Sequence, residues 1–358
     1  MATRTPETLL NLDRLSLNNE FVVKTPLTQR RYTPYTKSNQ RTQVLTKTPL
    51  PNFHQKRRAK TQEAKLSGRQ QRSHELSNDK TEDISTRIVN KTWRVYRVSP
   101  LYSFKTDAKS LKLYEKRLNS FLAVETCRAA EVQSRVKKKA LFTKLEGHTD
   151  GDYGVEIKIM TSEGKENAAK EELVAVLCCG GNVNDENLNI LNGDLTSLPV
   201  CLIKSSVLLK DSFLQWLENQ FGCRACLLLF SPTDLAWLAS LCAGIGEPTT
   251  SVELTYSVPA VIPGLDTIYF KMDAKDARRI WNLVHDPKQP CFTNEEAVRI
   301  LKSMETHFYH HFKVHLNQMQ LTTVGTSVAY IGQEGRIKIL QEPYVCYILQ
   351  QLSQLANF

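Results

Sequence analysis

The chain has 358 residues, of which 41% are apolar, and its formal net charge is +10. This length allows one large domain or two small ones, and this apolar content is ordinary for a protein with a packed core. No run of 18 uncharged apolar residues occurs, so we expect no membrane-spanning helix. The nine cysteines are an odd number and most lie in apolar runs, which favours buried, reduced thiols over a disulfide framework.

The excess positive charge lies in the first quarter of the chain. Residues 1–91 hold 18 basic and 8 acidic side chains, whereas basic and acidic side chains balance in the rest. This segment is rich in polar residues and lacks sustained apolar periodicity, so we predict a disordered basic tail. Such a tail attracts phosphate polyanions without a fold, although a merely solvated charged linker remains possible. The tail residues that we assign to DNA binding or nuclear import are Arg30, Arg31, Lys56, Arg57, Arg58 and Lys60.

Four Thr-Pro dipeptides occur in the same segment, the first at Thr5. Thr-Pro in accessible chain beside basic residues suits proline-directed kinases, so Thr25, Thr33 and Thr48 are candidates for phosphorylation. Each phosphate would add a charge of about −1.5 to −2 and would weaken binding to DNA.

The composition changes at Trp93, and secondary-structure signals follow in order. Alternating and apolar runs predict strands over residues 93–98, 155–160, 173–178, 198–203, 225–230, 251–258 and 267–272. Helical spacing predicts helices over residues 111–125, 208–221 and 232–244, the last of these capped by Ser231.

The last third of the chain carries the clearest signals. Asp273 caps one helix, and Thr293 with Glu296 forms a capping box for a longer helix that ends near His311. A long extended run over residues 313–331 then turns at residues 333–335 into a strand over 336–340, which makes a hairpin. A final apolar helix covers residues 344–355. Most strands are adjacent in sequence, so residues 92–358 are expected to form one α+β domain with a curved, mainly antiparallel sheet and packed helices.

Two groups of residues have the composition of metal sites. The first is the histidine cluster His307, His310, His311 and His315. No Cys or carboxylate pair completes a tetrahedral set nearby, so ordinary surface and interface histidines are favoured. The second is Cys223-x-x-Cys226, which has no second pair and enters an apolar run, so core cysteines are favoured. Because no phosphate-binding loop or catalytic motif is present, we predict no enzyme activity and no cofactor.

Several blocks occur in a characteristic order over residues 92–341. They include Trp93-x-x-Tyr96-x-x-Ser99-Pro100-Leu101-Tyr102-x-Phe104, Ser257-Val258-Pro259, His307-Phe308-x-x-His311-Phe312-Lys313-x-His315-Leu316 and Gly335-x-Ile337-Lys338-Ile339-Leu340. With these blocks the chain resembles the centromere protein L family. Residues 128–200 match that family only loosely, and the tail matches in little more than a Thr-Pro-Leu at Thr25.

The resemblance implies a non-catalytic subunit of the constitutive centromere-associated network, located in the nucleus at the centromere and kinetochore. It implies a heterodimer with centromere protein N, which joins centromeric nucleosomes and centromere protein C to other inner-kinetochore subunits for chromosome segregation in mitosis. It implies no small-molecule substrate, and it assigns the pairing surface to the C-terminal part, residues 251–358. Since a hairpin edge can accept a further strand, we expect partner binding by Val324, Val328, Ile337, Lys338, Ile339, Leu349 and Leu352.

Two other interpretations stay open at this point. One is a different nuclear DNA-binding or chromatin factor that acts through its basic tail, although no sequence-reading module is visible. The other is an enzyme with an unrecognised site, which a pocket with several convergent titratable groups would support.

Overall fold

The computed structural model describes residues 21–24, 47–49, 82–129, 136–147, 153–163, 170–180, 194–286 and 291–357. The six basic tail positions assigned to DNA binding or nuclear import lie outside these residues, as do Thr25 and Thr33. Thr48 lies in a short strand, β2 (Lys47–Pro49), which pairs with β14 (Cys291–Thr293).

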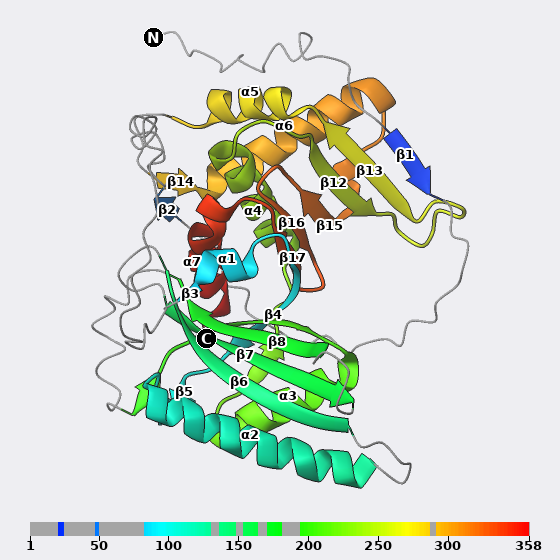
Figure 1. The fold of residues 1–358 in the computed structure, drawn as a ribbon. Coiled ribbons are helices and arrows are strands. Elements are labelled where there is room, and N and C mark those ends of the chain that lie inside the picture. Colours follow the sequence, from blue (N-terminus) through cyan, green and yellow to red (C-terminus); the bar gives the residue numbers. More distant parts are fainter. Residues whose placement is uncertain are drawn as a thin grey trace, which may run out of the picture.

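One large open sheet organises the molecule (Figure 1). Its strands are β1 (Phe21–Lys24), β3 (Glu82–Asp83), β4 (Thr92–Val98), β6 (Val136–Glu146), β7 (Tyr153–Glu163), β8 (Lys170–Cys179), β10 (Val200–Ser205), β11 (Ala225–Leu227), β12 (Val252–Ser257), β13 (Thr267–Met272), β15 (Gln320–Gly325), β16 (Ala329–Gly332) and β17 (Arg336–Ile339). They are ordered β1-β13-β12-β15-β16-β17-β4-β10-β8-β7-β6-β3, and β11 pairs with β4 beside this path. Among the described strands, only β3 and β6 pair in parallel. A further small sheet joins β5 (Leu101–Tyr102) to β9 (Leu195–Thr196). The predicted α+β fold with a mainly antiparallel sheet is confirmed.

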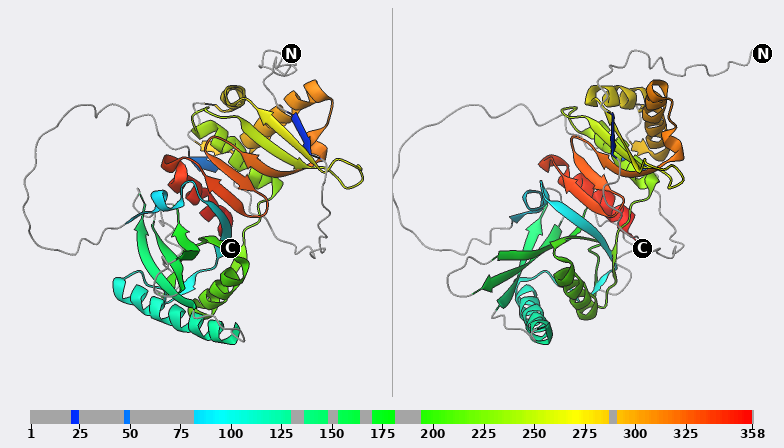
Figure 2. Two further views of the ribbon diagram at one scale, coloured as in Figure 1. Left: turned by 45° about the vertical axis from the view of Figure 1, so that its right-hand side comes forward. Right: turned by 90° about the vertical axis from the view of Figure 1, so that its right-hand side faces the viewer.

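The helices lie on the sheet in two lobes (Figures 1 and 2). They are α1 (Ile84–Ile88), α2 (Ala108–Ala129), α3 (Val207–Phe221), α4 (Pro232–Ile245), α5 (Ala274–Val284), α6 (Asn294–Phe312) and α7 (Val345–Ala356), with 3₁₀ turns at Leu316–Gln318 and Glu342–Tyr344. In one lobe α2 and α3 pack on β6, β8 and β10, and in the other α4, α5 and α6 pack together over the C-terminal strands. No described helix is long and apolar enough to cross a membrane.

The sheet separates two hydrophobic cores. Along β8, Val174 and Val176 belong to the core that contains α4, α6 and α7, whereas Ala175 and Leu177 belong to the core under α2 and α3. Because successive side chains of a strand point to opposite faces, both faces of β8 are covered.

Local capping explains where two long helices begin. The Ser231 hydroxyl accepts a hydrogen bond from the Asp234 amide at 3.1 Å, and the Asp234 carboxylate accepts one from the Ser231 amide at 2.8 Å. Thr293 and Glu296 form the same capping box at the start of α6, as the sequence predicts. Glu296 also lies 3.0 Å from Nδ1 of buried His285, so one carboxylate ties the end of α5 to the start of α6.

The structure differs from the sequence-based expectation at both ends of the folded region. Residues 82–90, which were assigned to the tail, form β3 and α1, and Ile84 and Ile88 of α1 are fully buried. A five-residue helix is too short for periodicity to reveal. The expected long extended run over residues 313–331 is instead a 3₁₀ turn followed by β15, a tight turn and β16.

Candidate functional site

The C-terminal hairpin of β16 and β17 lies in the middle of the sheet. Strand β17 pairs with β16 on one side and with β4 on the other, so Ile337 lies opposite both Ile331 and Trp93. A strand that is paired on both sides has no free donors or acceptors for another chain. The expectation that this hairpin accepts a partner strand is therefore wrong.

Six of the seven side chains expected to bind the partner are buried. Each is at most 1% exposed; they are Val324, Val328, Ile337, Ile339, Leu349 and Leu352. Their apolar pattern, visible in the sequence, marks the core of this lobe. Only Lys338 points away from this core, as the alternation of a strand requires.

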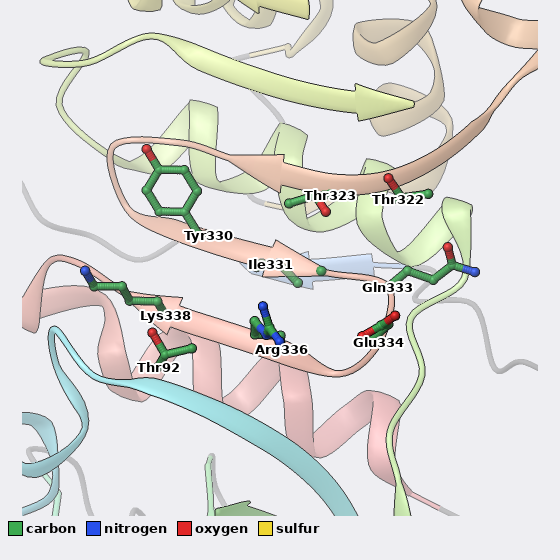
Figure 3. Close-up of a pocket in the computed structure, with 10 residues that line it drawn as sticks. Thr92, Thr322, Thr323, Tyr330, Ile331, Gln333, Glu334, Arg336 and Lys338 are labelled. Carbon is green, nitrogen blue, oxygen red and sulfur yellow. The ribbon is translucent and has the colours of Figure 1, made fainter. Parts of the chain in front are cut away.

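The face of the hairpin opposite the core forms an open groove of about 420 Å³ (Figure 3). Two rows of side chains cross its strands. In one row Arg336 lies opposite Gly332 on β16 and Arg94 on β4. In the other row Lys338 lies opposite Tyr330 and Thr92. The groove therefore collects residues that are about 240 positions apart in sequence.

Two glycines shape this surface. Gly332 leaves the position beside Arg336 without a side chain, and this absence opens the groove floor. The ring of Tyr330, which is 40% exposed, lies over Gly325, where any side chain would overlap the ring. A flat exposed aromatic ring next to Lys338 results.

The charge of the groove is positive. Arg94 is close to Glu334, with Nη2 and Oε2 3.8 Å apart, so its charge is partly compensated. Neither Arg336 nor Lys338 forms an ion pair with any residue that the structure describes. The hydroxyls of Thr92 and Thr323 line the same surface. Cations, hydroxyls and an aromatic face are the groups with which proteins contact phosphate and sugar of nucleic acids.

The histidines of the cluster lie in different environments. His307 is buried, and burial with the neighbouring His311 lowers its pKa. The His311 ring lies 4.7 Å from it, whereas His315 stacks on Tyr309 with ring centroids 4.3 Å apart. Over the described ranges, no three side chains of His, Cys, Asp or Glu are arranged to hold a metal ion.

The cysteine pair is a core feature. Cys223 is buried, its thiol donates to the Leu217 carbonyl at 3.6 Å, and burial raises its pKa to about 11. Such a thiol is protonated at neutral pH and has little nucleophilic or metal-binding character. Cys226 lies half-buried in β11.

Comparison with known proteins identifies the family. The family model for centromere protein L matches residues 87–357. Centromere protein L of Gallus gallus is 30% identical over 280 residues, which cover 75% of this chain and 79% of the relative. Centromere protein L of Homo sapiens is 30% identical over 282 residues, covering 76% and 80%, and that of Xenopus tropicalis is 28% identical over 280 residues, covering 75% and 79%. The chain therefore belongs to the centromere protein L family.

Proposed function

We propose that this chain is a non-catalytic subunit of the constitutive centromere-associated network, in the nucleus at the centromere and kinetochore. It pairs with centromere protein N as a heterodimer through residues 251–358. The pair connects centromeric nucleosomes to centromere protein C and other inner-kinetochore subunits during chromosome segregation. Family membership supports this role.

The groove contributes a DNA contact to this function. Arg336 and Lys338 occupy alternate positions of β17, so both cations lie on one face, and neither is neutralised by a described acid. The other side chains that line the groove include threonine hydroxyls, the Tyr330 ring, the Gln333 amide and the Glu334 carboxylate, which lies 3.8 Å from Arg94. This set suits the phosphate backbone better than it suits acid–base or nucleophilic catalysis.

The test compares Arg336→Ala/Lys338→Ala with a matched control, Lys275→Ala/Lys302→Ala, on the exposed faces of α5 and α6. Each full-length variant loses two positive charges. Duplex DNA binding is measured by fluorescence anisotropy between about 50 and 200 mM salt. Each lost phosphate contact should reduce the salt slope by about 0.9, so the groove variant should bind more weakly with a slope lower by about 1 to 2. Equal behaviour of the two variants would show that the groove does not contact DNA.

A third variant separates the contribution of the tail to DNA binding from that of the groove. Replacing Lys56, Arg57, Arg58 and Lys60 by Ala leaves the groove intact. If the tail also contacts DNA, this variant loses a further part of the salt slope. A factor that binds DNA through the tail alone predicts the opposite pattern, with binding lost in the tail variant and retained in the groove variant.

Pairing with centromere protein N has its own test. The full-length chain and centromere protein N, mixed at micromolar concentration, should elute together from a size-exclusion column. Separate elution at every concentration tried would contradict the proposed heterodimer, whatever the outcome of the DNA measurements.

A further inference from the structure

The outer edge of β13 is closed by a segment near the N-terminus of the chain. On one side β13 pairs with β12, and on the other side with β1, in the register Phe21↔Phe270 to Lys24↔Thr267 (Figure 1). Strand β1 has four residues and covers only the first four of the six positions of β13. The next described residue after Lys24 is Lys47, so β1 lies far in sequence from the strand with which it pairs.

The short strand β1 is held weakly at the edge of β13. Fixing each residue of the segment costs about 1–2 kcal/mol of backbone entropy, and four residues form few interstrand hydrogen bonds to offset that cost. Because β1 and β13 belong to the same chain, their pairing is intramolecular, which favours the closed edge over pairing with a second chain at low concentration. An extended segment of another chain can form the same backbone hydrogen bonds with β13.

The loop beside this edge is exposed and apolar. It connects β12 to β13 and projects from the sheet where β13 begins (Figures 1 and 2). Val261 in this loop is 85% exposed and Ile262 is 43% exposed. Exposed apolar side chains next to a pairable strand edge are typical of a surface that is covered by a protein partner.

We propose that the edge of β13, together with the loop over residues 259–264, is a binding site for an extended strand of the partner polypeptide, and that Phe21–Lys24 occupies this site in the free chain. The partner must displace β1, so its apparent Kd equals the intrinsic Kd divided by the fraction of molecules in which the edge is open. The identity of the partner rests on the proposed heterodimer. The strand site replaces the β16–β17 hairpin as the position of strand addition.

The first test opens the edge in the full-length chain. Val22→Pro/Val23→Pro removes two backbone donors and fixes φ at both positions, so β1 can no longer pair. The Kd for centromere protein N, measured by biolayer interferometry, should then decrease by about tenfold, equivalent to about 1.4 kcal/mol. The control, Thr42→Pro/Gln43→Pro, alters the tail outside both of its described strands and should leave Kd unchanged. An unchanged or larger Kd in the Val22/Val23 variant would overturn the proposal.

The second test changes the loop. Val261→Asp/Ile262→Asp places charge on the exposed apolar side chains and should weaken binding of centromere protein N by at least about tenfold. Leu283→Asp, at a 65% exposed position of α5, is the control and should bind normally. Equal binding by the loop variant and the control would show that the loop is not part of the binding site.

Hydrogen exchange of the free chain tests whether β1 closes the edge of β13, and this test does not depend on the heterodimer. If the unaltered chain does not bind centromere protein N, the heterodimer proposal fails, yet the edge can still be examined. Those amides of Thr267–Phe270 that face β1, which alternate along the strand, should exchange faster in the Val22/Val23 variant than in the unaltered chain. Identical exchange would show that β1 does not close the edge, and the inference would fail independently.

Discussion

Tyr256 and Glu305 form a polar pair inside the C-terminal lobe. Tyr256 on β12 is buried, and its hydroxyl donates to Oε1 of Glu305 on α6 at 3.0 Å. Burial raises the pKa of Glu305, and the hydrogen bond from Tyr256 offsets only part of this effect. The folded protein therefore binds the Glu305 proton more tightly than the unfolded chain does. The resulting stabilisation is complete below the unfolded pKa and is lost as pH rises through the raised folded pKa.

Glu305→Gln should remove this dependence on pH. The amide keeps an acceptor for the Tyr256 hydroxyl but does not ionise, so the variant should gain stability relative to the unaltered chain as pH rises from about 4 to about 7. Urea unfolding at several pH values measures the difference in free energy of unfolding. Glu295→Gln, an exposed residue of the same helix, is the control. A difference for Glu305→Gln that stays constant over this range would contradict the assignment.

Sequence distance explains which residue-scale features could be predicted. The partners in each capping box are three residues apart, so the Ser231 cap and the pairing of Thr293 with Glu296 are visible in the sequence. The Tyr256–Glu305 bond joins residues 49 positions apart, and the groove joins β4 to β17 over a far longer separation. The alternation of a strand places Ile337 and Ile339 on one face and Lys338 on the other, as the structure has them. It could not show which strands lie on either side.

At the scale of the element, β6 shows how a tertiary partner overrides a weak local signal. Three consecutive lysines follow Val136 at the start of this strand and hide its period-two pattern, so the sequence does not predict it. The amides of Ala140 and Phe142 donate to the side chains of Asn119 and Glu115 on α2, at 2.7 and 2.9 Å. A helix that supplies acceptors to the strand edge is not readable from the strand itself.

The central position of β17 determines the expected effect of Lys338→Pro. Lys338 lies between Tyr330 on β16 and Thr92 on β4. Proline in a strand paired on both sides removes a ladder hydrogen bond and clashes with its neighbours, at a cost of about 3 kcal/mol or more. We expect a clear loss of thermal stability by circular dichroism, whereas Lys338→Ala should remain folded. A Lys338→Pro variant as stable as Lys338→Ala would show that β17 is not a central strand.

For the whole molecule, one continuous sheet runs through both lobes. Strand β4 joins them, because it pairs with β17 on one side and with β10 on the other. Its Trp93 and Val95 belong to the core of the C-terminal lobe, whereas Tyr96 and Val98 belong to the core under α2 and α3. The region that carries the proposed pairing surface, residues 251–358, is therefore completed by segments that precede it in sequence.

This arrangement predicts that residues 251–358 do not fold alone. The fragment lacks β4, the neighbour of β17, and it also lacks α4, which packs on α6 and β15. It further loses the buried side chains of Ile84, Ile88 and Trp93 from its core. Removing these groups exposes several large apolar side chains, each of which contributes about 1.5–3 kcal/mol when buried, and this loss is comparable to the stability of a whole domain. Residues 82–358 should unfold in a single cooperative urea transition, and the fragment 251–358 should show none by circular dichroism. A cooperative transition in the shorter fragment would mean that the C-terminal lobe is an independent domain and that β4 is dispensable to it.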